Sequence, residues 1–234
     1  FTIVAGPPMP VTPSGVDVSC NGGNDGSATI TPNGGTAPYI YVWSQGGSSI
    51  GQNTQTASNL TAGTYDVLVT DANGCEATSQ VVVSEPTALA GNLTPTDVLC
   101  EGDCNGEVDV NGVSGGTTPY QYNIDGGANQ GGTNFNGLCP GAHQVVITDD
   151  NGCTLPLNTN VGEPAELVLT IDNVVDASCG TNSGSIEVSA AGGTTNYTFT
   201  IGGSSQTGTN LTFNNLAPNT HTVTITDANG CTDQ

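Results

Sequence analysis

Short runs of alternating polar and apolar residues, separated by turn-forming residues, dominate the chain. Thr64 to Thr70 reads T-Y-D-V-L-V-T, and Gln80 to Ser84 is rich in β-branched residues. Alternation with a period of two is typical of strands that have one face on a core and the other in solvent. No stretch of useful length has the i, i+3, i+4 spacing of an amphipathic helix. The pattern therefore predicts an all-β protein with no significant helix.

The pattern repeats with a period of 78 residues. The motif D-A-N-G-C at Asp71–Cys75 returns as D-D-N-G-C at Asp149–Cys153 and as D-A-N-G-C at Asp227–Cys231, so its cysteines are spaced by 153 − 75 = 78 and 231 − 153 = 78 residues. A second cysteine opens each period, at Cys20, Cys100 and Cys179. Asn and Gly in D-A-N-G suit a tight hairpin loop between two strands. With turn signals about every ten residues, each period predicts a seven-strand Ig-like β-sandwich.

The chain is thus expected to be a tandem array of Ig-like modules of about 78 residues. We expect repeats at residues 9–87, 88–165 and 166–234, the third without its last strand. Residues 1–8 are expected to be the last strand of a preceding repeat, by comparison with Gln80–Pro86. Two arrangements stay open: a longer chain that continues at both ends, or copies that exchange this strand head to tail. Both give a linear assembly of neighbouring repeats.

Four residues are expected to have structural roles in the sandwiches. Trp43 falls on the predicted third strand, where a large ring would be buried against the other sheet. Tyr65 ends a stretch with the form of a tyrosine corner, and His143 and His221 take the corresponding positions in the later repeats. We therefore expect both histidines to have a structural role at this corner and no catalytic role.

Composition and charge exclude several functions. The 234 residues contain no Lys or Arg and 21 Asp plus Glu, which gives a formal net charge of -21. Such a chain repels nucleic-acid phosphates and anionic lipid headgroups. No run approaches the ~20 apolar residues of a membrane helix, so we expect no membrane insertion. Eight cysteines indicate disulfides formed in an oxidising compartment, and hence an extracellular protein.

The cysteines that recur in each repeat allow two pairings. The first closes each repeat on itself, as Cys20–Cys75, Cys100–Cys153 and Cys179–Cys231. The second joins successive repeats as Cys20–Cys153 and Cys100–Cys231, and leaves Cys75 and Cys179 for repeats outside this chain. The first meets a difficulty, because the opening cysteine and the hairpin lie at opposite ends of an Ig-like sandwich, and bonded Cα atoms must be within ~7 Å.

An additional pair, Cys104 and Cys139, occurs only in the second repeat and joins two loops expected at the same end. We expect it to be a disulfide. Zinc is a poor alternative, because no second close Cys or His pair follows Cys100-x3-Cys104.

Two weaker binding sites are considered. Acidic side chains gather at the start of the second repeat and form the best candidate for a weak calcium site, namely Glu101, Asp103, Glu107 and Asp109. Three aromatic residues at equivalent positions could contact a glycan if exposed, namely Tyr41, Tyr122 and Phe199. Core packing is the competing explanation for these rings. No other cofactor is expected.

The motifs that recur resemble a known family. Cys20–Thr29, Gly34–Tyr39, Trp43-Ser44, Ala62–Tyr65 and Thr70–Cys75 together resemble the SprB repeat of Bacteroidetes. That family builds giant cell-surface adhesins exported by the type 9 secretion system, and its name-giving member moves along the cell during gliding motility. The resemblance implies the same kind of role here. Later repeats depart from it, since His143 and His221 replace the corner Tyr and Asn196 replaces the Pro before Tyr.

The sequence thus predicts a non-catalytic structural segment of a surface filament or stalk adhesin that gives reach and attachment. No catalytic residues are assigned, because the turn chemistry of the hairpin accounts for the acidic pair Asp149-Asp150. One alternative is that the repeats themselves bind polysaccharide, assisted by calcium. Another is that they are spacers of a secreted enzyme. The expected partners are neighbouring repeats or copies of the chain itself, and surface polysaccharide.

Overall fold

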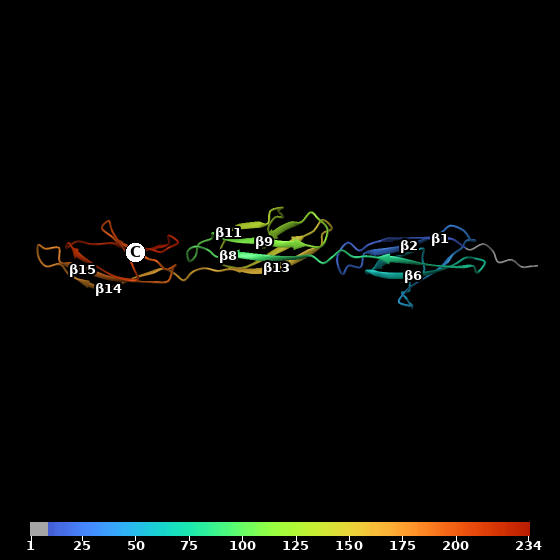
Figure 1. The fold of residues 1–234 in the computed structure, drawn as a ribbon, viewed down its shortest axis with the longest axis horizontal. Helices are drawn as coiled ribbons and strands as arrows, with labels where there is room; N and C mark the ends of the chain where they lie inside the picture. The colour runs from blue at the N-terminus through green and yellow to red at the C-terminus, as the bar shows by residue number, and fades with distance from the viewer. Residues whose placement is uncertain (1–8) are drawn as a thin grey trace, which may run out of the picture. The chain divides into compact units, whose positions relative to one another are not determined.

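The computed structural model describes residues 9–234, and every regular element in that range is a β-strand (Figure 1). The segment 1–8, predicted to be a preceding repeat's last strand, lies outside the described residues. Within residues 9–234 the structure contains no helix that could cross a membrane. The prediction of an all-β chain of tandem Ig-like modules is confirmed.

The first stretch of chain forms seven strands in two sheets. They are β1 (Val11–Val16), β2 (Gly26–Pro32), β3 (Ile40–Gln45), β4 (Ser48–Ser49), β5 (Thr56–Leu60), β6 (Gly63–Thr70) and β7 (Glu76–Val83). One sheet has the order β1-β2-β5 and the other β4-β3-β6-β7. All recorded pairings are antiparallel. The number of strands and their division between two sheets agree with the sandwich that the sequence predicts.

The second stretch repeats this arrangement with a shorter third strand. Its strands are β8 (Ala90–Thr96), β9 (Gly106–Ser114), β10 (Gln121–Ile124), β11 (Asn134–Leu138), β12 (Gly141–Thr148) and β13 (Thr154–Val161). They form the sheets β11-β9-β8 and β10-β12-β13. The orders correspond to those of the first stretch, without an equivalent of β4.

The third stretch also has two sheets. Its strands are β14 (Val168–Val175), β15 (Gly184–Ala191), β16 (Thr198–Ile201), β17 (Ser204–Thr207), β18 (Asn210–Leu216), β19 (Val223–Thr226) and β20 (Thr232–Asp233). The sheets are β14-β15-β18 and β17-β16-β19-β20. Strands close in sequence thus stay together in each sheet, as the colours of Figure 1 show.

The chain divides into two compact units. One contains the described residues up to Gly91 with 112–122 and 146–155, and the other contains 92–111, 123–145 and 156–234. This division cuts through the middle stretch of chain. The boundaries 9–87, 88–165 and 166–234 therefore stay a prediction.

The core of the first sandwich lies between its two sheets. On β6 the inward positions Tyr65, Val67 and Val69 are buried, while the residues between them are not, as strand alternation requires. Trp43 on β3 is fully buried, and its Nε1 donates a hydrogen bond of 2.9 Å to the Thr54 carbonyl. Ile30 on β2 closes the same core from the other sheet. The predicted role of Trp43 is confirmed.

The third sandwich fills the equivalent space with different rings. Phe199 on β16 and Phe213 on β18 are buried in one cluster with Val188 and Ile225. By strand register Phe199 takes the position of Tyr41 and Ile201 that of Trp43, so in this repeat a smaller aliphatic side chain stands where the first repeat has Trp.

Candidate functional site: the cysteine-bridged loops

A buried carboxylate builds the hairpin between β6 and β7. Asp71 is only 5% exposed and accepts hydrogen bonds from the backbone N–H groups of Thr36, Asn73 and Cys75 at 2.8–2.9 Å. The bond from Cys75 is the main cause of the lowered pKa of Asp71. Gly74 completes the turn at a φ of 80°, a value that favours glycine. The carboxylate thus fixes the backbone on which Cys75 is held.

The same construction recurs in both later hairpins. Asp149 accepts from the N–H groups of Thr117, Asn151 and Cys153 at 2.8–3.0 Å. Asp227 does the same in the third hairpin, with Cys231 N–H at 2.9 Å. The sequence analysis explained these aspartates by turn chemistry, and the structure adds that each one is buried and bridges two loops.

Two disulfides join successive repeats. Cys20 bonds to Cys153 with a Cα–Cα distance of 5.6 Å, and Cys100 bonds to Cys231 at 5.7 Å. The second of the two pairings left open by the sequence is therefore confirmed. Pairing within each repeat is wrong.

Strand length explains why the first pairing fails. Asn21, next to Cys20, donates its side-chain amide to the Pro86 carbonyl just beyond the end of β7, whereas Cys75 precedes the first residue of β7. The strand has 8 residues, and at about 3.3 Å per residue it separates its ends by roughly 26 Å. A disulfide allows only ~7 Å between Cα atoms.

The third disulfide is local. Cys104 in the loop before β9 bonds to Cys139 in the loop after β11, with a Cα–Cα distance of 3.9 Å. This confirms the disulfide predicted between the two additional cysteines that occur only in the second repeat. The two remaining cysteines, Cys75 and Cys179, are free and exposed.

Side-chain amides support both joining disulfides, and the sequence analysis did not find them. Asn151 donates to the Ser19 carbonyl at 3.1 Å, and Asn229 donates to the Leu99 carbonyl at 2.9 Å. Each acceptor immediately precedes the opening cysteine. The recurrence of Asn two residues before the hairpin cysteine was visible in the sequence, but turn formation alone explained it.

Glutamate side chains accept hydrogen bonds from the backbone of the first two opening loops. Glu85 accepts from Gly22 N–H at 2.7 Å, and Glu163 accepts from Gly102 N–H at 3.0 Å. These residues belong to the repeated Glu-Pro dipeptide of the sequence. The dipeptide thus stabilises the loop that carries each opening cysteine.

The residue at the tyrosine-corner position makes the same kind of hydrogen bond in all three repeats. Tyr65 donates its hydroxyl to the Thr61 carbonyl, and a His143 ring nitrogen contacts the Cys139 carbonyl, each at 2.9 Å. His221 contacts the Ala217 carbonyl at 2.9 Å in the third repeat. In every case the partner lies four residues earlier. The structural role predicted for these residues is confirmed.

His143 has one further partner. Its other ring nitrogen lies 2.7 Å from an Asp125 carboxylate oxygen, and this bond is the main cause of a raised pKa of His143. The pKa of Asp125 is lowered, first by the backbone N–H of Gln144 and then by His143. The pair links β12 to the turn after β10.

Comparison with known proteins identifies the repeat. The SprB repeat model matches residues 12–48, 92–129 and 171–206, which correspond to the first half of each sandwich. The chain carries three SprB repeats. Among curated proteins nothing matches.

Solved structures with a similar arrangement share little sequence with the SprB repeats. The three N-terminal domains of the outer capsid protein Hoc of bacteriophage RB49 align at 15% identity and a TM-score of 0.44, covering 87% of this chain and 80% of that one. A 1.5-MDa bacterial ice-binding adhesin aligns at 16% identity and a TM-score of 0.41, covering 97% and 95%.

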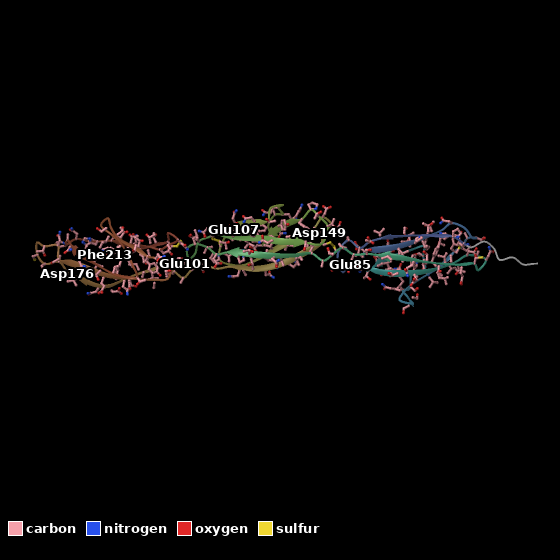
Figure 2. All side chains as sticks on the ribbon, in the orientation of Figure 1. Glu85, Glu101, Glu107, Asp149, Asp176 and Phe213 are labelled. Atoms are coloured by element: carbon pink, nitrogen blue, oxygen red, sulfur yellow. A yellow bond between two sulfur atoms is a disulfide. The ribbon has the colours of Figure 1, made fainter. Side chains whose placement is uncertain are left out.

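The expected calcium site of the second SprB repeat is not assembled. Glu107 and Asp109 on β9 both accept from the Asn134 amide, whereas Glu101 and Asp103 lie in the loop before that strand. Figure 2 labels Glu101 and Glu107 at separate places. Within residues 9–234 no group of three or more His, Cys, Asp or Glu side chains could hold a metal ion. The strand carries two of the four carboxylates away from the loop, and this corrects the sequence hypothesis.

The expected glycan contacts are also corrected. Tyr122 is 5% exposed and Phe199 is fully buried, so neither ring has a face open to a sugar. Tyr41 is half-buried against the core of the first SprB repeat. These residues alternate onto the inward face of their strands, and core packing is therefore the explanation for them.

Proposed function

We propose that these SprB repeats form a non-catalytic structural segment of a large extracellular surface adhesin, and that the segment gives reach to an attachment site. The observation that carries this proposal is the recurrence of one disulfide arrangement, Cys20–Cys153 and then Cys100–Cys231. A covalent bond from each repeat to the next allows tension to pass along the chain even where a sandwich opens. The family resemblance extends the proposal to adhesins of the gliding type, exported by the type 9 secretion system.

Composition supports an extracellular location. Three disulfides in one chain are stable in an oxidising environment and rare in the cytosol. A formal charge of -21 with no Lys or Arg makes neighbouring segments repel each other, which favours separate, soluble stalks. The absence of both residues in the printed sequence also leaves no site for trypsin-like proteases.

The polar chemistry of the repeats is used for structure, which supports a non-enzymatic role. Asp71, Asp149 and Asp227 each accept backbone N–H groups within their hairpins. Both histidines bond the corner carbonyls. Hydrogen bonds to the backbone thus account for these side chains, and the proposal assigns none of them a catalytic role.

Replacement of the segment in the full-length protein tests the proposal. In one strain the three repeats are replaced by an unrelated Ig-like tandem of equal length, and in another they are deleted. Attachment of cells to a surface is measured, and antibodies against the purified chain are bound to intact cells carrying the unaltered protein. We expect the equal-length replacement to restore attachment and the deletion to reduce it, with antibody binding at the cell surface.

The opposite result would assign the ligand to the repeats themselves. If the equal-length replacement fails to restore attachment while the replaced protein still reaches the surface, the segment contributes more than length. Antibodies that bind only lysed cells would contradict the extracellular location.

A further inference from the structure

One hairpin and one opening loop carry cysteines without a bonding partner. Cys75 belongs to the first hairpin and Cys179 to the third opening loop, and both are exposed. The other two hairpin cysteines, Cys153 and Cys231, are both bonded to opening-loop cysteines. In this chain a hairpin cysteine therefore bonds to the opening-loop cysteine of the preceding repeat. Within residues 9–234, Cys75 is the one hairpin cysteine that has no such partner.

The hairpin of Cys75 is already built like the bonded ones. Cys75 N–H donates to Asp71 at 2.8 Å, and Cys153 N–H donates to Asp149 at the same distance. Cys231 N–H donates to Asp227 at 2.9 Å. The backbone that presents the sulfur is thus the same with and without a disulfide, so bond formation needs no change of the loop.

A second group in the hairpin points to the same partner. Asn151 donates to Thr117 Oγ1 at 3.0 Å and also to the Ser19 carbonyl, and Asn229 donates to Thr194 Oγ1 at 2.9 Å and also to the Leu99 carbonyl. Asn73 keeps the first of these bonds, to Thr36 Oγ1 at 2.9 Å. In the described part of the chain it has no second carbonyl partner. The missing acceptor is the carbonyl that precedes an opening cysteine.

We propose that Cys75 and Cys179 are the two halves of a further junction between SprB repeats. Cys75 bonds to the opening-loop cysteine of another repeat, and Asn73 donates to the carbonyl before that cysteine. Cys179 bonds to the hairpin cysteine of another repeat. The partner is an SprB repeat in either case, supplied by an adjoining part of a longer polypeptide or by a second copy of this chain.

The opening loop that carries Cys179 differs from the other opening loops in its turn. The third opening loop is one residue shorter, so that its turn hydrogen bond runs from Thr181 N–H to the Ser178 carbonyl at 3.1 Å. In the first repeat the corresponding bond runs from Gly23 N–H to the Cys20 carbonyl at 2.9 Å. Cys179 therefore occupies the second position of its turn, where Cys20 occupies the first. Its exposure leaves it open to the hairpin of a partner.

The bond needs an oxidant, and a small-molecule disulfide such as oxidised glutathione supplies it. The thiols of Cys75 and its partner lose two protons and two electrons and form one S–S bond. The oxidant takes up both electrons and both protons, its own S–S bond breaks, and two glutathione thiols are released.

The purified chain, with its three internal disulfides intact, tests the proposal in a glutathione redox buffer. We expect oligomers on a non-reducing gel, and peptides that contain Cys75 linked to Cys179 after cleavage by a Glu- or Asp-specific protease. Equal amounts of Cys75→Ser and Cys179→Ser chains, which each keep one of the two thiols, should give mostly the mixed dimer. A share of mixed dimer equal to that of random thiol pairing would overturn the proposal.

Recognition by Asn73 is tested separately from thiol chemistry. In the Cys179→Ser chain, Asn73→Ala should lower the ratio of mixed to like dimers by roughly fivefold, the effect of one hydrogen bond of ordinary strength. The control Asn214→Ala, at an exposed position of the third repeat, should leave the ratio unchanged. An unchanged ratio in the Asn73→Ala chain would overturn the role of Asn73.

Disulfide mapping of the protein isolated from its own cells distinguishes the two sources. A Cys75 peptide linked to the Cys179 peptide identifies a second copy, and one linked to a cysteine outside these 234 residues identifies an adjoining repeat. Free or glutathione-capped thiols at both positions would overturn the inference. The length-replacement experiment would still stand, so the two failures are distinguishable.

Discussion

The three disulfides should determine how far the chain can be extended by force. In a fully unfolded, reduced chain every residue between Cys20 and Cys231 lies on the stretched path, which is 231 − 20 = 211 residue steps. With all bonds closed, the shortest covalent path crosses from Cys20 to Cys153, runs back to Cys139, crosses to Cys104, runs back to Cys100 and crosses to Cys231. It keeps 153 − 139 = 14 and 104 − 100 = 4 residue steps and so removes 193. At about 3.4 Å per extended residue, the contour length should be roughly 650 Å shorter in the oxidised chain.

Single-molecule pulling from handles at the two ends measures this difference directly, before and after addition of a reductant. Cys20→Ser leaves the Cys100–Cys231 bond, which removes 131 residues instead of 193, so its oxidised length should be roughly 210 Å greater than that of the unaltered chain. After removal of both joining bonds by Cys20→Ser together with Cys100→Ser, the oxidised chain should be only about 120 Å shorter than the reduced chain, because the Cys104–Cys139 bond still removes 35 residues.

The local disulfide makes a separate, smaller contribution to this length. The Cys104–Cys139 bond lies on the segment between Cys100 and Cys153 that the shortest path of the oxidised chain follows. Cys104→Ser should therefore lengthen the oxidised chain by about 120 Å, because a sequence separation of 35 residues returns to the path. Equal lengths of the unaltered chain with and without reductant would refute the connectivity and the transmission of tension derived from it.

Three further predictions concern stability, measured by chemical denaturation followed by circular dichroism. Trp43→Ala should cost about 3–5 kcal/mol because the ring is fully buried, whereas Val42→Ala at an exposed position of the same strand should cost less than about 0.5 kcal/mol. Asp149→Ala leaves three backbone N–H groups without an acceptor and should cost about 3 kcal/mol, against almost nothing for the exposed Asp150→Ala. The raised pKa of His143 means that its stabilisation is fully present below about pH 6.5 and is lost as the pH rises through the folded-state pKa, so His143→Gln should remove that part of the pH dependence.

Local pattern was sufficient to predict the fold of each repeat. Alternation along Thr64 to Thr70 assigned β6 and its inward residues, and the D-A-N-G turn marked the hairpin that follows. Trp43 could be placed because one large ring in a module with few aromatics has to occupy its core. In all three cases the prediction depends on residues that are close together in the sequence, because strand geometry alone determines on which face of the sheet each side chain lies.

The sites that depend on long-range position were harder to predict. Glu101 and Glu107 are close in sequence, but the start of β9 separates them, so proximity along the chain did not produce a cluster of ligands. The residue two positions after Tyr120 could face inward or outward, and only the register of its strand places Tyr122 inward. The sequence allowed two pairings of the cysteines. The length of β7 excludes the pairing within each repeat, because this strand separates the opening loop from the hairpin.

The order of the bonded cysteines has a consequence beyond tension. Because Cys100 lies between Cys20 and Cys153, and Cys153 lies between Cys100 and Cys231, the two loops closed by disulfides overlap. A single cut of the backbone anywhere between Cys20 and Cys231 therefore leaves both pieces covalently joined. Pairing within each repeat would lack this property, since one cut between Cys75 and Cys100 would separate the chain. If the segment is exposed to proteases outside the cell, as the proposed function requires, this overlap keeps the chain connected after one cut, with no ion pair to Lys or Arg contributing to the connection.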